Sequence, residues 1–247
     1  MARLDRKGKK ARWTKARAAE HLYNAKLRSV ARQVGSLVKG LAPKGLVKDA
    51  GVLVRALKAY AELLEPWAHS VAGFMLADVA RKDARMWSQH SKEMGAELRR
   101  EINSAPTGDI LRQLQEQQVT LIKSLPLEAA QRVHDLAMES TITGTRASEI
   151  AKRILETEDV TEARARLIAR TEVSRAASNL VQARATWAGS DGYIWRTSND
   201  ANVRDSHQEM EGKYVRWSQP PILDKLTGHA GALPNCRCFS EPVFKDD

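Results

Sequence analysis

The chain has only two cysteines among its 247 residues, and they stand close together near the C-terminus, at positions 236 and 238. Two such neighbours cannot build the disulfide framework of a small secreted domain. Long apolar runs are also missing, because the longest are interrupted by Arg55 or ended by Asp78 and fall short of the roughly 18 residues of a membrane span. A secretory signal requires an apolar stretch after its charged N-terminal residues, and no such stretch is present here. We therefore expect a soluble, cytosolic protein with no membrane partner.

Catalytic sequence motifs are scarce as well. The chain has no glycine-rich phosphate loop, no nucleophile elbow and no carboxylate cluster for two metal ions. We therefore expect no enzyme. The hydrophobic content of 43% is still enough for a buried core, so one large or two modest domains are expected.

Positive charge is concentrated at the N-terminus. Residues 1–48 carry 14 Lys and Arg against two Asp and Glu, whereas the rest of the chain carries 26 against 28. Lys and Arg contacts to phosphates support nucleic-acid binding of little sequence preference. The alternative is a solvated arm that aids solubility or pairs with an acidic protein. The DNA-binding residues that we expect are Arg3, Arg6, Lys7, Lys9, Lys10, Arg12, Lys15 and Arg17.

Apolar residues recur at helical spacing over most of the chain, which predicts an α+β protein with a mainly helical N-terminal two thirds. Pro66 and Pro126 fit first helical turns. We expect a basic arm or helix at 1–48, a helical region at 49–144 and a third domain at 145–247. The expected helices are 14–38, 47–64, 66–103, 109–124, 127–140, 146–156 and 161–188.

The last of these helices has an N-cap candidate in Asp159 and ends before Gly189. One face carries Glu172, Arg175 and Asn179, a polar row that can pin a loop by hydrogen bonds or hold a catalytic carboxylate. A different face of the helix carries an apolar stripe of mostly small residues, which is expected to pack on a neighbour. Its members are Ala169, Val173, Ala176, Leu180, Ala183 and Trp187.

The composition changes after Gly192 to that of a small α+β unit of short antiparallel strands. Alternating residues predict strands at 193–197 and 213–217, with a short helix at 203–211 between them. The extended piece 236–243 is expected to return to the first strand, because three tryptophans, Trp187, Trp195 and Trp217, otherwise have few ways to close a core.

The order of polar and glycine residues from Ala169 to Val243 resembles the Mu F-like minor head proteins of tailed bacteriophages, also called head morphogenesis proteins. The resemblance covers about residues 145–247 and ends in the string Pro234-Asn235-Cys236-Arg237-Cys238. The residues that carry this structural motif are Arg170, Glu172, Asn179, Trp195, Asp200, Arg204, His207, Gly212, Cys236, Arg237 and Cys238.

The resemblance implies a minor capsid protein in the virion head, assembled in the host cytoplasm and needed for head morphogenesis or genome delivery. The partners that it implies are the portal protein and phage DNA, with scaffold or major capsid protein as further candidates. Two other functions stay open: a nuclease- or transferase-like enzyme using Glu172 and His207, with Arg204 and Glu209 beside them, or a plain DNA-binding protein.

The resemblance also bears on zinc, because many similar tails carry a Cys-x-x-Cys pair and a His-Pro-x-Cys-Arg-Cys block. Here the first pair is replaced by Arg204 and His207, and the histidine position is Leu233. The remaining ligand candidates are His207, Cys236 and Cys238, with His229 as a fourth. Since structural zinc takes four ligands, we expect no cofactor, with a zinc site as the alternative. Without zinc, His207 hydrogen-bonds across the unit and the cysteines are small buried residues.

Overall fold

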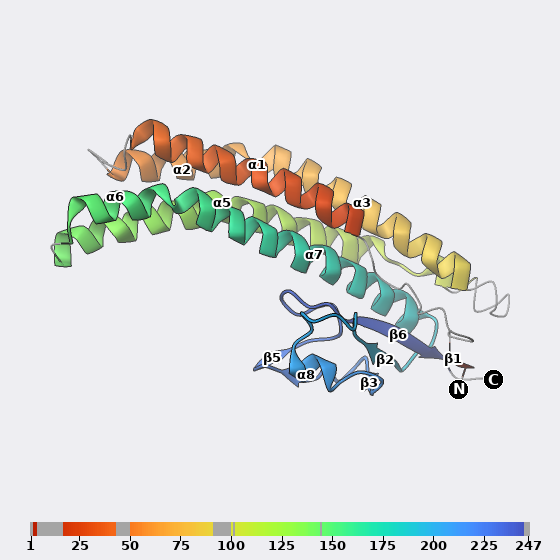
Figure 1. The fold of residues 1–247 in the computed structure, drawn as a ribbon. Helices are drawn as coiled ribbons and strands as arrows, with labels where there is room; N and C mark the ends of the chain where they lie inside the picture. Colours follow the sequence, from red (N-terminus) through yellow and green to blue (C-terminus); the bar gives the residue numbers. More distant parts are fainter. Residues whose placement is uncertain are drawn as a thin grey trace. The chain divides into compact units, whose positions relative to one another are not determined.

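The computed structural model describes residues 2–3, 17–42, 50–90, 100, 102–143 and 145–244 (Figure 1). Along the described chain, a two-residue strand comes first, a series of helices follows, and most of the strands lie in the last quarter. The expected fold class, mainly helical with a C-terminal unit of short antiparallel strands, is confirmed. None of the described helices is both long and apolar enough to cross a membrane.

The chain divides into two compact units, each built from separate stretches of sequence. One consists of Met1–Glu20, Phe74–Leu114 and Arg170–Asp247, and the other of His21–Gly73 and Gln115–Ala169. We call the first the sheet unit and the second the helical unit.

The helical unit contains most of α1 (Arg17–Leu41), α2 (Ala50–Leu63), most of α5 (Gly108–Thr143), α6 (Ala147–Leu155) and the start of α7 (Thr157–Trp187). Helices α1, α2, α5 and α6 present apolar stripes to a common core, as their sequence spacing predicts. That core is formed by Val34, Val38, Ala42, Leu53, Leu57, Ala129, Ala130, Val133, Leu136, Ile150 and Ile154. A buried hydrogen bond of 2.9 Å from the Tyr23 hydroxyl to Gln118 Oε1 joins α1 to α5.

Proline 126 lies inside α5, so the two helices expected at 109–124 and 127–140 are one. A proline in a helix interior lacks the backbone N–H and normally breaks the helix. Here the flanking residues Ile122, Leu125 and Ala129 are all buried, and this packing on both sides holds the helix through the proline.

The other helix boundaries differ by a few residues from the expected ones. Helix α3 (Glu65–His90) begins one residue before Pro66, and residues 102–104 are also helical. Residue 100 is helical too, and residues 91–99 and 101 lie outside the described part of the chain. Helix α7 begins at Thr157, so the assignment of Asp159 as its N-cap is wrong, and Asp159 lies in the first turn. Gly189 does follow the end of α7, with φ +80°.

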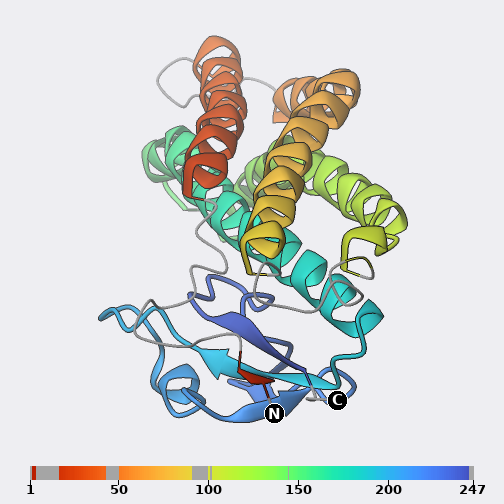
Figure 2. The ribbon, with the colours of Figure 1, turned by 90° about the vertical axis from the view of Figure 1, so that its right-hand side faces the viewer.

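The sheet unit contains a four-stranded antiparallel sheet in the order β1-β6-β2-β3. Its strands are β1 (Ala2–Arg3), β2 (Gly192–Arg196), β3 (Tyr214–Arg216) and β6 (Phe239–Phe244). The last strand returns to the first of the C-terminal strands, as expected, with Gly192 opposite Val243 and Arg196 opposite Phe239. Strand β6 pairs with β2 on one side and with the short N-terminal strand β1 on the other. Figure 2 shows the blue strands of this sheet together with the short red β1.

The sheet unit also contains α8 (Asp205–Gln208) and a hairpin of β4 (Ile222–Leu223) and β5 (Leu226–Thr227). Its core includes Trp195 and Trp217, as expected, but the third tryptophan is Trp87 of α3. Trp187 is 52% exposed, so its assignment to the apolar stripe is wrong. Near the end of α7 the buried positions are instead Val181, Ala185 and Ala188.

Candidate functional site

Residues 229–238, which we call the tail loop, are held by side chains of α7. Arg170 Nη1 donates to Asn235 Oδ1 at 3.1 Å, and the Asn235 backbone N–H donates to Thr171 Oγ1 at 3.0 Å. Two turns further along α7, the Ser178 hydroxyl donates to the Ala230 carbonyl at 2.8 Å. A loop with few regular backbone hydrogen bonds is thereby fixed by polar groups of a rigid helix.

Arg175 makes the central contact of this set. Its Nε donates to the Ala232 carbonyl at 3.1 Å, and its Nη1 lies 2.8 Å from Oε1 of the buried Glu172. The polar row expected on this helix thus pins a loop through Arg175, which Glu172 orients. No hydrogen bond of Asn179 is found among the described residues.

The tail loop brings its two cysteines to a histidine of α8. His207 Nδ1 lies 3.4 Å from Sγ of Cys236 and 3.4 Å from Sγ of Cys238. All three side chains are buried, and their ligand atoms lie within 4.8 Å of one another. We call these three residues the His–Cys cluster.

Backbone amides of the tail loop point at one of the sulfurs. The N–H groups of Gly231 and Cys238 both donate to Cys236 Sγ at 3.4 Å. Hydrogen bonds from the Cys238 thiol, from His207 and from these amides lower the pKa of Cys236, although burial opposes them. The site therefore favours a thiolate at Cys236.

A carboxylate stands on the other side of the His207 ring. Asp224 Oδ2, in the turn of the β4–β5 hairpin, lies 4.0 Å from His207 Nε2. Ser206 donates to the same oxygen at 3.0 Å, and Arg204 Nε lies 3.7 Å from it. Arg204 also donates to the Pro234 carbonyl at 2.8 Å, so it links the hairpin to the tail loop.

The fourth ligand candidate, His229, does not join the cluster. Its Nδ1 lies 3.2 Å from the Tyr193 hydroxyl and its Nε2 3.1 Å from the Trp217 carbonyl. Burial lowers the pKa of His229. Both ring nitrogens are thus used in the aromatic core, and the expectation of His229 as a metal ligand is wrong for this arrangement.

The remaining motif residues build the frame around the cluster. Arg237 Nη1 lies 2.5 Å from Asp200 Oδ2. Although desolvation opposes the shift, hydrogen bonds from Asn202, Ser198 and Arg237 lower the pKa of Asp200 to about 2. The Trp195 indole is fully buried and meets the His207 ring edge-on at 5.6 Å. Gly212 adopts φ +79°, a conformation that L side chains rarely adopt.

The expected DNA-binding residues lie mostly outside the described residues. Arg3 belongs to β1 and Arg17 opens α1. The other six, Arg6, Lys7, Lys9, Lys10, Arg12 and Lys15, lie outside the described part of the chain. Their role in DNA binding stays a prediction.

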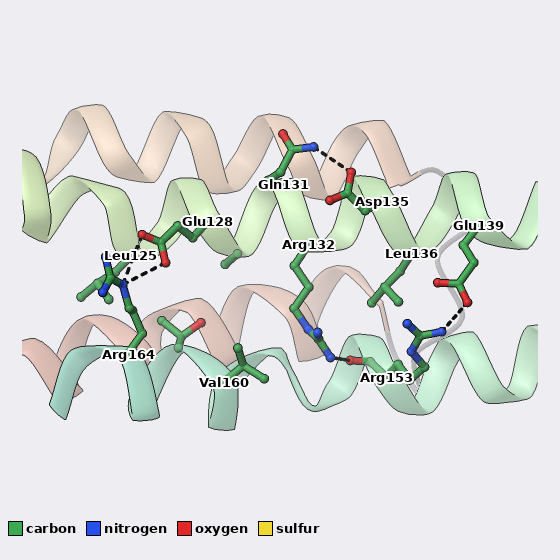
Figure 3. A pocket seen from close by; sticks show the side chains of 12 residues that line it. Leu125, Glu128, Gln131, Arg132, Asp135, Leu136, Glu139, Arg153, Val160 and Arg164 are labelled. Atoms are coloured by element: carbon green, nitrogen blue, oxygen red, sulfur yellow. Dashed lines mark hydrogen bonds and ion pairs between the residues drawn. The ribbon is translucent and has the colours of Figure 1, made fainter. Parts of the chain in front are cut away.

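A pocket of about 440 Å³ lies in the helical unit between α5, α6 and α7 (Figure 3). Its charged groups pair with each other: Arg164 with Glu128 at 3.2 Å, and Arg153 with Glu139 at 2.6 Å. Arg132 donates to the Arg153 carbonyl at 3.1 Å. These ion pairs resemble those of a helix–helix packing surface, and we assign no chemistry to the pocket.

Sequence reasoning missed three residues of the site: Asp224, Thr171 and Ser178. Asp224 and Lys225 form a two-residue hairpin turn with φ of +52° and +66°. A short turn between Leu223 and Leu226 was a signal for such a hairpin, but it does not say which side chain the turn would present to His207.

Comparisons with known proteins bear on the same region. Residues 131–241 match the family model described as "Phage Mu protein F like protein", and the resemblance stated from the sequence is confirmed there. An uncharacterized protein of Haemophilus influenzae is 29% identical over 176 residues, which cover 71% of this chain. The match spans 39% of that relative's length. No solved structure matches the chain.

Proposed function

We propose that this chain, phage Mu F-like over residues 131–241, is a minor head protein of a tailed bacteriophage. The family match carries the proposal, since the matched family is one of phage head morphogenesis. The match covers the end of α5, all of α6 and α7, strands β2 to β5 and the first half of β6. The residues that hold the tail loop to α7 lie within it.

The family is structural, and the positions of Glu172 and His207 support the same reading for this chain. Glu172 is buried and engaged with Arg175, whose other contact is a loop carbonyl. His207 faces two cysteine sulfurs. A catalytic acid or base has to reach the proton that it transfers, and both groups are committed to internal contacts instead.

We further propose that the sheet unit supplies a protein-binding surface through its β4–β5 hairpin. Ile222 is 73% exposed and Leu226 is 42% exposed. Large apolar side chains exposed together on a small element favour a protein partner. In a phage head the partner that we propose is the portal protein, with scaffold and major capsid protein as the other candidates.

The basic N-terminal residues are the part of the chain that we propose binds phage DNA. Their charge excess favours binding to phosphates with little sequence preference. A head protein that contacts both the portal and the genome would reside in the virion, after assembly in the host cytoplasm.

The test is co-purification of the full-length chain with the portal protein encoded in the same genome. Wild type should co-purify, and Ile222→Asp with Leu226→Asp should not. Gln208→Asp with Lys213→Asp is the matched control, because both positions are exposed in the same unit but lie outside the hairpin, and it also adds two carboxylates.

Two further observations can overturn the proposal. Mass spectrometry of purified heads should find the protein in them, and gene deletion should leave heads defective. Normal heads without the protein would contradict a role in head morphogenesis. If the protein is found in heads and the Ile222→Asp, Leu226→Asp variant still binds the portal protein, only the assignment of the hairpin as the binding surface is contradicted.

A further inference from the structure

We propose that His207, Cys236 and Cys238 bind one divalent cation of the zinc type, and that Asp224 positions the His207 ring from outside the coordination sphere. The proposal concerns this chain's own ligand set. It does not depend on the role in the phage head.

The donor atoms suit such a cation. Two cysteine sulfurs, which bind a metal ion as thiolates, and one imidazole nitrogen are the soft and borderline ligands that zinc prefers over oxygen-rich sets. Zn–S and Zn–N bonds of about 2.3 and 2.05 Å at a tetrahedral angle separate the two donor atoms by roughly 3.5 Å. Both Nδ1–Sγ distances here are 3.4 Å. Both imidazole–sulfur distances therefore match those of side chains that share one ion.

The backbone prepares one sulfur for a metal. Two amide groups, of Gly231 and Cys238, donate to Cys236 Sγ, and amide donors stabilise a thiolate in a buried site. Gly231 adopts φ +84°, and a Cβ there would lie 3.1 Å from the Cys238 carbonyl oxygen. A side chain is thus disfavoured at the position that aims one of these amides.

The second ring nitrogen of His207 supplies the independent observation. In the described part of the chain, Nε2 is buried and has no hydrogen-bond partner within bonding distance, yet the Asp224 carboxylate stands 4.0 Å away. A histidine that binds metal through one nitrogen commonly directs its other N–H to a carboxylate. A small movement of the hairpin turn would close that hydrogen bond and fix the tautomer with Nδ1 free for the ion.

Asp224 is itself held in place, by Ser206 at 3.0 Å and by Arg204 at 3.7 Å. Among the described residues no fourth metal-ligating side chain joins the cluster. The fourth position is therefore left to water or to another molecule, as in sites with three protein ligands.

The test uses the purified full-length protein, loaded with Zn²⁺ or Co²⁺ and freed of excess metal. Metal analysis should find one ion per chain. Co²⁺ should give the thiolate charge-transfer and d–d absorption of a tetrahedral site with sulfur ligands. Cys236→Ser, Cys238→Ser and His207→Asn should each lose that spectrum. His229→Asn, which removes a half-buried histidine of the same unit, should keep it.

Asp224→Asn tests the positioning residue, and asparagine is chosen because it tolerates the positive φ of this turn. Its affinity for Co²⁺ should fall about 10- to 100-fold with an unchanged spectrum. The melting temperature of the metal-free protein should not change, whereas a merely structural carboxylate would lower it. Asp224→Glu should recover part of the affinity.

If a cysteine variant does not fold, measurements on the wild-type protein and on Asp224→Asn still test whether the cluster binds a metal ion. A chelator should lower the wild-type melting temperature and added Zn²⁺ should restore it. Folded wild type that takes up no Zn²⁺ or Co²⁺ would overturn the proposal and assign the 3.4 Å contacts to thiol–imidazole hydrogen bonds. Loss of the spectrum in His229→Asn would overturn the ligand set.

Discussion

Arg175 Nη1 lies 2.8 Å from Oε1 of Glu172, one turn earlier on α7. Glu172 is almost fully buried, and Arg175 reaches past it to the Ala232 carbonyl. A buried carboxylate with an arginine partner is costly to break on one side, because the other charge is then left without compensation. The pair thus couples the helix to the tail loop that carries both cysteines.

Replacing Glu172 by Gln should therefore destabilise the protein without removing an activity. The amide keeps the shape but loses the charge, and the free energy of unfolding should fall by about 1–3 kcal/mol. Thermal unfolding checks this, with Glu149→Gln on the exposed face of α6 as the control. A nuclease or transferase activity that vanishes in Glu172→Gln at unchanged stability would instead assign the residue to catalysis.

DNA affinity should depend on the basic N-terminal residues. We expect Lys7, Lys9, Lys10 and Arg12 changed together to Gln to weaken binding to duplexes of any sequence. The slope of log affinity against log salt should become shallower by up to about 3.6, since each phosphate contact contributes roughly 0.9. Substitution, unlike truncation, leaves β1 in place.

The matched control removes the same number of charges elsewhere, at Lys58, Lys152, Lys213 and Lys225, which are exposed. Its salt slope should match wild type. An equal loss in both variants would show that overall charge drives binding, and an unchanged slope in the first would remove the N-terminal residues from the DNA interface.

Strand β6 should be indispensable to the sheet unit. It pairs with β2 over five residues and also with β1, and the Val243 carbonyl lies 2.8 Å from the buried Ser190 hydroxyl. Removing residues 234–247 should unfold the unit. The milder Val243→Asp should also do so, because it places a charge at a buried position.

Ile222→Asp is the control for this change, since it introduces the same carboxylate at an exposed strand position. Near-UV circular dichroism of the buried tryptophans reports the outcome. The native spectrum should persist in Ile222→Asp and be lost in Val243→Asp. Retention of the spectrum in both would mean that β6 does not close the core.

Asp83 should make stability depend on pH. Burial raises the pKa of Asp83 to about 6, although a hydrogen bond from Arg184 at 2.7 Å opposes the shift. The folded state thus binds this proton more tightly than the unfolded chain does. The resulting stabilisation is fully present below about pH 4 and is lost as the pH rises through about 6.

The measurement is the difference in unfolding free energy between wild type and Asp83→Asn, which cancels the titration of all other groups. Between pH 4 and pH 7 that difference should move against wild type by roughly 2 kcal/mol, because the unfolded carboxyl is already about half ionised at pH 4. A difference that is constant with pH would place the pKa of Asp83 near its ordinary value.

The sequence predicts helices, strands and turns that depend on local residue patterns. It does not predict features that depend on tertiary packing. The strand at 193–197, the Gly189 stop and the return of the last strand follow from alternation, glycine chemistry and the need to close a core. The continuity of α5 through Pro126 could not be predicted in this way. The tendency of a proline to break a helix is overcome only by buried neighbours, and the sequence does not identify these. The exchange of Trp187 for Trp87 has the same cause, since both lie on helices and only tertiary contacts choose between them.

The candidate site divides in the same way. His207 and the two cysteines stand out by residue type, and the polar row of α7 by its spacing. The choice against His229 depends on Tyr193 and Trp217, which take both of its ring nitrogens. The role of Asp224 depends on a hairpin turn that brings a carboxylate to a ring 17 residues away, and no spacing rule predicts such a contact.

The core that surrounds the His–Cys cluster includes Trp87 and Ile102 as well as residues of the last quarter of the chain. A segment of residues 145–247 transferred into another protein would lack these two side chains, and it would also lack β1, which pairs with β6. Recombination between relatives can therefore exchange this unit intact only if the crossover carries the 74–114 stretch with it, or if the recipient supplies an equivalent tryptophan.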